Sequence, residues 1–587
     1  MPKQPWSNRA WVALVGTAVV LAVAVQTPWT QSAAVLPKRL ALHALAILCL
    51  LHATPRLRAG WATLLAGILT LWQALAWTAS DTGWLGLPRL LDETAALALF
   101  CAVTGGRIPR QVFLKPLIAA AALGAALGLL QQWVDIPGLA QATRPSGLFV
   151  SRAVAGEYVA ASVVLTVVFL TGRWRPFTLV LLGIQVAFLI STRSRTGWAV
   201  GFLALAWVCS RLATRERLRV GATTALAVLL ALLLTPGPRL AWRSPTPYSD
   251  SLSALAHLEL AGRLDTWRNT LEMVKAHPVL GVGPGGFAPT YAAFHRTVTK
   301  DRAFSAGQQI EEPHNEPLRL AVEGGVPGLA LGGLLAAALL FKRPRHASVR
   351  TIALLAALGC LGLSSLVSLT FVAIPTLVLT TCTAGLLGRR GAKGAVHIPS
   401  LVGRGAFLTL AATLVWVDLP QWRASRAWRQ AEEAARQGSL RSAYERLQAA
   451  AADTRDATAY ARTAQLAQQA GDSRRCTGAA REGLRHAPRS TRLLSLLGEC
   501  ETHQGNTDAA RKAYARNLQL LPDDPWALLG LARLSTGPEH TTLLQQAAEA
   551  ARLEWTRLPP TLSQPELERL EQLSRQIAQE LTTTEGG

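Results

Sequence analysis

Apolar blocks of membrane-spanning length follow one another from near the N-terminus to about Pro420, and the pattern then turns polar. A helix crosses a bilayer with about 20 apolar residues, or somewhat fewer at the short end of the range. Thirteen blocks qualify, near residues 10–26, 40–55, 60–78, 90–105, 112–130, 153–171, 176–191, 197–210, 220–235, 324–341, 351–369, 371–388 and 403–419. Only helices satisfy a lipid-exposed backbone at this composition. The pattern therefore predicts an all-α, polytopic helical membrane protein with about 12–13 transmembrane helices.

Basic side chains are concentrated in alternate short loops between these blocks. The formal net charge is +23, and residues 1–235 alone hold 20 basic against 6 acidic side chains. The clusters are Lys3/Arg9, Arg56/Arg58, Arg107/Arg110/Lys115, Arg173/Arg175, Arg211/Arg215/Arg217/Arg219, Lys342/Arg343/Arg345/Arg350 and Arg389/Arg390/Lys393/Arg404. The positive-inside rule assigns these loops and the N-terminus to the cytoplasm. Because membrane topology explains the charge, we expect no nucleic-acid partner.

This topology predicts how the chain is divided into domains. Residues 1–420 form the transmembrane domain, and its long hydrophilic loop, 236–316, lies outside the cytoplasm. The polar part after the last block lies on the same exterior side. It consists of helical repeats over residues 421–560 and a polar tail over residues 561–587.

The repeats have a regular period. Gly438, Gly471 and Gly505 are spaced 33 and 34 residues apart, and Pro488 and Pro522 are again 34 apart. This pattern resembles tetratricopeptide repeats, in which two helices meet at a glycine turn and stack into an α-solenoid. Such arrays usually bind a protein partner, so the repeats are either a partner-binding surface or a scaffold that stabilises the membrane domain.

The cysteines and the carboxylates offer little metal chemistry. Five of the seven cysteines fall in apolar blocks, where they pack, whereas Cys476 and Cys500 lie in the exterior repeats. In an oxidising compartment this pair either forms a disulfide or remains as two thiols. The sequence contains no CxxC, no HExxH and no carboxylate set with ligand spacing. We therefore predict no metal site and no cofactor.

Polar residues gather at the predicted exterior ends of several blocks. Arg193 and Arg195 in "ISTRSRTGW" run against the charge bias of the chain. An arginine at a membrane boundary either snorkels to water or offers a planar guanidinium to a phosphate or carboxylate. In "RPSGLFVSRAVAGEYVA" the arginines and Glu157 open another block, as a capped helix entry or as substrate contacts.

A helix with one apolar stripe is predicted within residues 262–287. Leu264, Trp267, Leu271 and Val274 recur at helical spacing, so the helix lies along the membrane surface or packs on the bundle. Arg263 and Arg268 project beside the stripe, and Pro278 ends the helix. The following "GVGPGGF" is a glycine-rich turn whose backbone can approach a ligand closely.

The stretch "EEPHNEPLRLAVEGGVPG" places acids, a histidine and an asparagine directly before an apolar block. Pro317 suits the first turn of a helix, with Asn315 or Glu316 as its cap. His314 would then lie at the N-terminus, where free N–H groups favour an anion. In a regular helix Gly325 would return to the face of His314. This histidine is either an ordinary loop residue or, opposite the two arginine clusters, a functional one.

Together these groups supply cations for a diphosphate and a titratable group for a hydroxyl. Preorganised arginines stabilise the charge that a leaving diphosphate gains in the transition state. A histidine or a carboxylate can accept the proton of the attacking hydroxyl. The chemistry points to glycosyl transfer from a polyprenyl-diphosphate-linked glycan, since nucleotide sugars are absent outside the cytoplasm.

Three stretches together resemble the O-antigen ligase and O-antigen polymerase superfamily: "STRSRTGW", "GRLDTWRNTLEMVKAHPVLGVGPGGF" and "HNEPLRLAVEGGVPG". The similarity covers roughly residues 10–420 and includes a histidine followed, after ten residues, by a glycine, here His314 and Gly325. The resemblance implies a metal-independent glycosyltransferase of the bacterial inner membrane, with its site on the periplasmic face. It implies an undecaprenyl-diphosphate-linked glycan as donor.

The resemblance also implies roles for individual residues. His314 is similar to the family's essential histidine, Arg195 to its arginine at this span end, and Arg263 to its loop arginine that contacts the diphosphate. These three are the predicted catalytic residues. The predicted substrate-binding residues are Arg193, Arg268, Asn315, Gly325 and Glu312, and Glu323 is a weaker candidate.

Four functions remain open at this point. A ligase would transfer a glycan to lipid A–core, a polymerase would join lipid-linked O-antigen or exopolysaccharide units, and a protein O-oligosaccharyltransferase would modify a protein bound by the repeats. A transporter or scaffold is the non-enzyme alternative. A transporter places ionisable residues near the bilayer midplane, whereas here they lie at the outer ends of the blocks, which favours an enzyme.

Overall fold

The helices of the membrane part follow the apolar blocks. In a computed structural model, the residues that the structure describes are 8–30, 32–53, 58–105, 108–139, 144–149, 151–169, 175–235, 237, 240, 246–256, 263–294, 310–341, 348–368, 370–389, 396–397, 400–557 and 564–585. The bundle helices are α1 (Asn8–Ala24), α2 (Leu36–Ala53), α3 (Trp61–Thr78), α4 (Leu87–Thr104), α5 (Gln111–Leu130), α6 (Arg152–Val167), α7 (Arg175–Ser191), α8 (Arg195–Cys209), α9 (Thr214–Leu234), α13 (Glu316–Leu340), α14 (Val349–Ser364), α15 (Ile374–Gly388) and α16 (Ser400–Thr413). Each of the thirteen predicted blocks coincides with one of these helices, so the all-α prediction is confirmed.

Four of the described helices, α3, α5, α9 and α13, are long and apolar enough to cross a membrane by length and composition. Five shorter apolar helices, α1, α7, α8, α14 and α15, accompany them. Large apolar side chains stay exposed along α3 and α9, among them Ile68, Leu71, Leu229 and Leu233. Exposed apolar surface of this extent is typical of a membrane-facing bundle. The count of 12–13 spans remains a prediction.

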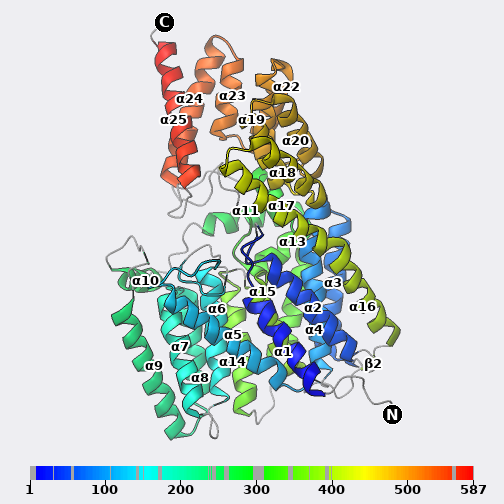
Figure 1. Ribbon diagram of the computed structural model, residues 1–587, viewed down its shortest axis with the longest axis vertical. Helices are drawn as coiled ribbons and strands as arrows, with labels where there is room; N and C mark the ends of the chain where they lie inside the picture. Colours follow the sequence, from blue (N-terminus) through cyan, green and yellow to red (C-terminus); the bar gives the residue numbers. More distant parts are fainter. Residues whose placement is uncertain are drawn as a thin grey trace.

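Between α9 and α13 the chain forms short helices at one end of the bundle. They are α10 (Pro247–Ala256), α11 (Arg263–Ala276), α12 (Phe287–Tyr291) and the 3-10 helix Ala292–Phe294. Figure 1 shows α11 above the bundle and beneath the C-terminal helices. Parts of the predicted loop 236–316 lie outside the described residues, namely 236, 238–239, 241–245, 257–262 and 295–309. Of the predicted cytoplasmic clusters, Lys3, Arg56, Arg107, Arg173, Lys342, Arg343, Arg345, Arg390 and Lys393 also lie outside them.

Two short elements complete the described bundle. The 3-10 helix Gly83–Leu85 lies in the turn between α3 and α4. The strands β1 (Arg58–Ala59) and β2 (Val396–His397) pair antiparallel, with Arg58 opposite His397 and Ala59 opposite Val396. Because each strand has only two residues, this ladder ties two loops together and leaves the fold all-α.

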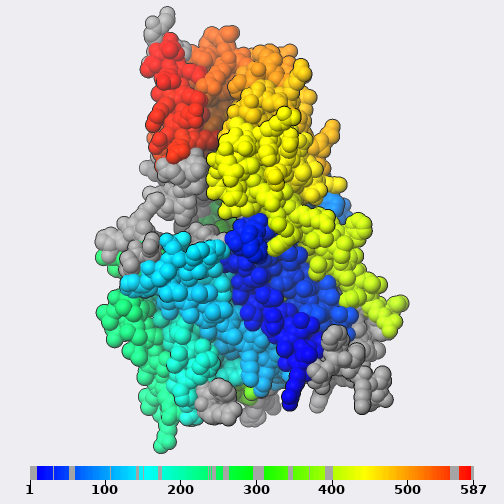
Figure 2. Space-filling view, in the orientation of Figure 1, coloured from blue at the N-terminus to red at the C-terminus, as the bar shows by residue number. Residues whose placement is uncertain are grey.

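The last bundle helix leads into the repeats without a break. Beyond α16 the π-helical stretch Leu414–Asp418 continues directly into α17 (Leu419–Arg436). In Figure 2 this stretch runs along the outside of the bundle and up to the repeats. The boundary predicted at residues 420 and 421 therefore falls inside one continuous helical stretch, where no flexible linker separates the two parts.

The C-terminal helices form the predicted solenoid, in which each helix packs on the next. Its pairs are α17 with α18 (Leu440–Thr454), α19 (Ala457–Gln469) with α20 (Ser473–His486), α21 (Thr491–His503) with α22 (Thr507–Leu520) and α23 (Pro525–Leu534) with α24 (Pro538–Arg557). Gly438, Gly471 and Gly505 join the two helices of a pair with φ of 81°, 73° and 78°. Glycine is the residue that adopts this left-handed conformation without steric cost, which explains its spacing in the sequence.

Two details of the solenoid go beyond the sequence expectations. Cys476 and Cys500 are joined by a disulfide between α20 and α21, with Cα atoms 5.9 Å apart. The segment predicted as a polar tail contains α25 (Gln564–Glu585). Its Leu570, Leu573 and Ile577 are buried against α23 and α24, so α25 closes the end of the solenoid core rather than projecting as a tail.

Candidate active site

His314 lies just before α13 in a left-handed backbone conformation, with φ of 51°. Asn315 caps the helix as predicted, since its Oδ1 accepts the Leu318 N–H at 2.9 Å. Its Nδ2 donates to the Leu366 carbonyl at 2.8 Å, and the indole of Trp267 donates to the Pro313 carbonyl at 2.9 Å. These bonds hold the backbone on both sides of His314. The side chain reaches solvent but is partly covered by its neighbours, and the imidazole makes no hydrogen bond within the described part of the chain.

Arg263, the first residue of α11, lies close enough to His314 to act on its charge. The Arg263 guanidinium is half-buried and donates to the Val367 carbonyl. Withdrawal from water, followed by the positive charge of Arg263, lowers the pKa of His314 to about 4. His314 is therefore a neutral imidazole at neutral pH, with a ring nitrogen free to accept a proton.

Arg195 completes a group of three with His314 and Arg263. It is the first residue of α8, behind the N-cap Ser194, and partial burial together with the Arg195 charge lowers the pKa of Arg263. Within the described residues the Arg195 guanidinium has neither an ion pair nor a hydrogen bond. Two like charges this close to each other disfavour stability, and they favour the binding of an anion between them.

The other predicted arginines are placed differently. Arg193, with φ of 54°, precedes α8 and donates from Nε to the Ser251 hydroxyl of α10 at 2.9 Å. Arg268 points to solvent and lies 3.5 Å from the Asp265 carboxylate of its own helix. Arg193 therefore borders the group of His314, Arg263 and Arg195, whereas Arg268 faces away from buried parts of the site.

The buried face of α11 also differs from the predicted apolar stripe. Thr266, Asn269, Thr270 and Met273 are buried, whereas Leu264 and Leu271 of the stripe remain exposed. The two threonines bond within the helix, and Asn269 donates to the Tyr291 hydroxyl at 3.0 Å. The leucines of the stripe are thus exposed, whereas Val274 packs against the apolar cluster that contains Met273, so each of the two predicted orientations holds for part of the stripe.

A buried ionic network lies directly behind His314, and the sequence reasoning missed most of it. The Arg89 side chain of α4 pairs with Glu312 and, at 2.6 Å, with Glu323. Arg319 of α13 pairs with Glu316 at 2.6 Å, with Glu323 at 2.8 Å and with Glu93 at 3.5 Å. Glu312 thus contacts Arg89 in the structure rather than His314, Arg263 or Arg195. The sequence signal was "PRLLDE", a charged set opening an otherwise apolar block.

The second missed element is the short segment between α14 and α15. The Ser365 carbonyl accepts the Glu316 N–H at 2.8 Å, and Leu366 and Val367 accept from Asn315 and Arg263. The Phe371 N–H donates to Glu316 at 2.9 Å, and the Thr370 hydroxyl donates to the buried Glu157 of α6 at 2.8 Å. Through its described residues, 365–368 and 370–371, this 365–371 segment therefore fixes Arg263 relative to the start of α13, and Glu157 anchors the segment through Thr370.

The helix α13 is interrupted at Gly325, so the regular helix assumed in the sequence reasoning is wrong there. Gly325 has φ of 67° and ψ of −174°, and a Cβ at this position would lie 2.0 Å from the Val279 carbonyl oxygen. The Val326 N–H donates to the Pro278 carbonyl at 2.8 Å. Gly325 therefore permits the approach of the chain after α11, and it does not return to the face of His314.

The N–H groups of the glycine-rich turn after α11 bond to α13 at this interruption, so they are not open to a ligand. Val282 and Gly283 donate to the Val322 and Glu323 carbonyls at 2.8 and 3.0 Å, and the Gly285 N–H donates to the Glu323 carboxylate at 2.9 Å. A Cβ at Gly281 would lie 2.5 Å from the Val322 carbonyl oxygen. Glycine is thus required at Gly281 because two backbones meet, and the turn positions Glu323 in the ionic network.

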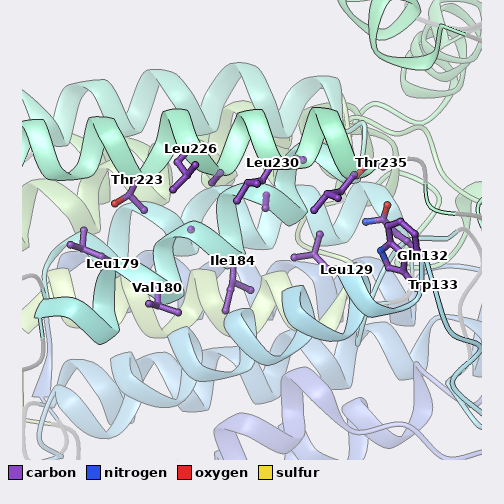
Figure 3. A pocket seen from close by; sticks show the side chains of 15 residues that line it. Leu129, Gln132, Trp133, Leu179, Val180, Ile184, Thr223, Leu226, Leu230 and Thr235 are labelled. Atoms are coloured by element: carbon purple, nitrogen blue, oxygen red, sulfur yellow. The ribbon is translucent and has the colours of Figure 1, made fainter.

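An apolar groove runs down the bundle on the side of α5, α7 and α9 (Figure 3). It has a volume of about 500 Å³ and is lined along its length by Leu179, Ile184, Leu226 and Leu230. At one end it reaches Thr235, whose hydroxyl lies 3.2 Å from that of Ser191. This end of the groove therefore lies near the end of α7, two residues before Arg193 in the chain.

The arrangement can bind an anion and accept a proton in one place. The described residues contain no group of three or more His, Cys, Asp or Glu side chains arranged to hold a metal ion. Arg195 and Arg263 supply positive charge, His314 supplies a neutral base, and the groove supplies an apolar surface between α5, α7 and α9. The ionic network and the 365–371 segment keep these groups in place.

Comparison with known proteins assigns part of this region. Residues 177–332 match the family described as O-Antigen ligase, and all eight predicted site residues fall within that match. No match was found among curated proteins. Among solved structures, the chain is similar to Pseudomonas aeruginosa pilF, with 13% identity and a TM-score of 0.20, over 32% of this chain and 84% of that one. It is also similar to yeast Tom70, with 12% identity and a TM-score of 0.20, over 72% and 88% of the two chains.

Proposed function

We propose that the O-antigen ligase domain of this chain transfers a glycan from undecaprenyl diphosphate to a hydroxyl of lipid A–core. The reaction takes place on the periplasmic face of the bacterial inner membrane. The observation that carries the proposal is the group of three: two arginines and a neutral, unbonded imidazole meet within the segment that matches the family. The protein acts as a multi-pass glycosyltransferase, and its repeats share the periplasmic side with the site.

In the proposed reaction the acceptor oxygen forms a bond to the first sugar carbon of the donor, and the bond from that carbon to the diphosphate oxygen breaks. The diphosphate leaves with the electron pair of that bond. Arg195 and Arg263 stabilise the negative charge that it gains, because preorganised cations act most strongly where charge develops. The acceptor hydroxyl gives its proton to His314. Atoms and charge balance without a metal ion.

The lowered pKa of His314 suits an enzyme whose base becomes stronger when the donor binds. With a pKa of about 4, the free imidazole is deprotonated but only weakly basic. A bound diphosphate would offset the Arg263 charge, which is one of the two causes of the lowered pKa. His314 would then become a stronger base only when the donor is in place.

The apolar groove along α7 and α9 supports a lipid-linked donor. A polyprenyl chain is apolar along its whole length and carries its charge at one end. The groove is apolar along its length and reaches Thr235, whose hydroxyl lies 3.2 Å from that of Ser191 at the end of α7 that leads to Arg193. In the proposal Arg193 borders the diphosphate, and Asn315, Gly325 and Glu312 maintain the shape of the binding site. Arg268, on the exposed side of α11, is assigned to the outer rim of that site, where it would meet the glycan or the lipid headgroups.

The test uses a strain that lacks the gene, complemented with the intact protein or with His314→Ala, and it sizes the glycans on the carrier lipid and on lipid A–core. We expect long glycans to remain on the carrier, with bare core, in the absence of the gene and with His314→Ala. Membrane levels of the variant should equal those of the intact protein. Normal core decoration by His314→Ala would contradict the proposal.

The same experiment separates the related activities. A collapse of carrier-linked glycans to single repeat units would indicate an O-antigen or exopolysaccharide polymerase, whose acceptor is another lipid-linked glycan. The protein O-oligosaccharyltransferase has one structural observation in its favour, because the solenoid packs on the end of the bundle that holds His314. Loss of glycan from periplasmic proteins, with a normal core, would identify that activity.

A further inference from the structure

The solenoid is docked on the end of the bundle that holds the candidate site. Leu521, in the turn between α22 and α23, is buried in one cluster with Met273 of α11, Phe287 of α12 and Val322 of α13. Farther along, the Arg455 guanidinium lies 4.7 Å from the ring centroid of Trp84, in the turn between α3 and α4. The buried Leu521 and the cation–π contact of Arg455 thus fix the solenoid at two separate points, one on the chain from α11 to α13 and one on the α3–α4 turn.

Between these two contacts lies a cavity of about 140 Å³. The α3–α4 turn contributes Ser80 and Asp81, the segment after α11 contributes His277 and Thr290, and the solenoid contributes His486 and Arg489. Three of these side chains, those of Asp81, His277 and Arg489, form neither a hydrogen bond nor an ion pair with any described residue. Hydrogen-bonding groups without partners at the wall of a cavity are available for a ligand.

The cavity is separate from the group of His314, Arg263 and Arg195. His277 directly follows the C-terminal end of α11, whereas Arg263 is the first residue of that helix. A helix rises 1.5 Å per residue, so the 14 residues of α11 place the cavity about 20 Å from the proposed reaction. A ligand there cannot be the diphosphate or the sugar that is being transferred.

We propose that this cavity binds one sugar ring of a glycan whose reacting end lies at His314. The inference rests on the proposed function. Its volume of about 140 Å³ suits a single sugar ring better than a nucleotide or a folded peptide. The lining offers a carboxylate acceptor, a guanidinium donor, two imidazoles and hydroxyls, which is the mixture that a hydroxyl-rich ring requires.

The solenoid then has a definite role, because it supplies the wall that carries His486 and Arg489. A glycan long enough to reach from His314 to the cavity gains this contact, and a shorter one does not. The ring belongs either to the glycan on the donor or to the oligosaccharide of the acceptor. In both cases the protein binds long glycans more tightly than short ones, and the rate of the transfer step is the same for both.

The test measures transfer by the purified full-length protein with carrier-linked donors of one or several repeat units and with full-length or truncated acceptor oligosaccharides. The variants are Arg489→Ala and His277→Gln. The control is Arg485→Ala, an exposed arginine four residues before Arg489 that pairs with Glu482 at 2.7 Å and does not line the cavity.

We expect KM for the multi-unit donor, or for the full-length acceptor, to rise about tenfold in both variants, since a hydrogen bond to a charged group is lost. The value of kcat and the KM of the shortest substrates should stay unchanged, as should every constant of Arg485→Ala. Whichever substrate shows the length effect is the source of the bound ring. Equal effects on short and long substrates, or no effect on either, would overturn the proposal.

A binding measurement keeps this inference separate from the proposed reaction. Oligosaccharide released from the carrier lipid of the strain is titrated into the full-length His314→Ala protein by calorimetry, with and without Arg489→Ala. Binding that is lost only with Arg489→Ala supports the cavity as a sugar site even if no transfer is detected. Binding that is indifferent to Arg489 refutes it.

Discussion

His314 illustrates how one residue acquires chemistry from its surroundings. A histidine in water is half-protonated near pH 6.5, whereas this imidazole has a pKa of about 4 because it is partly withdrawn from water and lies near Arg263. Its backbone is held by bonds from Trp267 and through Asn315, and its ring is left without a partner. The residue therefore presents a neutral base at a fixed place.

This charge state predicts a particular pH dependence. In the free protein His314 is deprotonated above about pH 4, so kcat/KM should keep its full value down to roughly that pH. With the diphosphate bound, the charge of Arg263 is offset, and this part of the lowering of the His314 pKa is removed. We therefore expect the acid limb of kcat to lie at a higher pH than that of kcat/KM.

Initial rates of the purified protein between about pH 3 and 9, at limiting and at saturating donor, would measure both limbs. Lys275→Ala is a suitable control, because Lys275 is an exposed cation of α11 that pairs with Glu272 at 2.8 Å and should leave both limbs in place. Coincident acid limbs for kcat and kcat/KM would argue against His314 as a base that responds to the donor.

At the scale of the element, α13 determines how the site is built. The helix begins at its Asn315 cap, carries Glu316, Arg319 and Glu323 into the ionic network, and is interrupted at Gly325. The carbonyls of Val322 and Glu323, which the interruption frees, are satisfied by the glycine-rich turn after α11. A broken helix is tolerated at membrane depth only where protein satisfies the freed backbone groups, as it does here.

A substitution at Gly325 tests the importance of the interruption. Gly325→Ala introduces a Cβ against the Val279 carbonyl oxygen, at a backbone angle that disfavours any side chain, so we expect a loss of about 1–3 kcal/mol or more. Gly333→Ala, later in the same helix, meets no atom within 4 Å and should be neutral or slightly stabilising. Thermal unfolding of the two detergent-solubilised variants would show the difference, and equal Tm values would contradict it.

At the scale of the whole molecule, the site, the chain between α9 and α13, and the solenoid share one end of the bundle (Figure 1). The continuous helical stretch from α16 to α17 is fixed to that end of the bundle as well. The His43 imidazole lies 2.5 Å from the Asp418 carboxylate, and the Arg39 guanidinium donates to Gln421 at 3.4 Å. The solenoid is therefore fixed on the end of the bundle that holds the candidate site, rather than attached through a flexible linker.

This arrangement predicts where the C-terminus lies. Alkaline phosphatase fused after Gly587 should be active, because the solenoid lies on the same side as His314, which we assign to the periplasm. The control is a fusion between α15 and α16, at the opposite end of the bundle, which should be inactive as phosphatase and fluorescent with green fluorescent protein. The reverse pattern would overturn the topology and, with it, the periplasmic site.

The sequence by itself determined the features that depend on local periodicity. Apolar runs specify the bundle helices, and glycines at 33- and 34-residue spacing specify the turns of the solenoid. The cap at Asn315 was predictable because a cap and its helix are neighbours in the chain. His314, Arg263 and Arg195 were selected from residue type at the ends of the blocks, together with a family resemblance, and their catalytic role stays a prediction.

Only the tertiary structure decided how these elements meet. Arg89 and Glu323 pair with each other although they are 234 residues apart in the chain. The Val367 carbonyl accepts a hydrogen bond from Arg263 across 104 residues. Helical periodicity reports neighbours three or four positions away and carries no information on contacts between elements. Distant parts of the chain meet at the interruption at Gly325, at the 365–371 segment and at the contact of Leu521 with the bundle. The sequence alone therefore left these features undetermined.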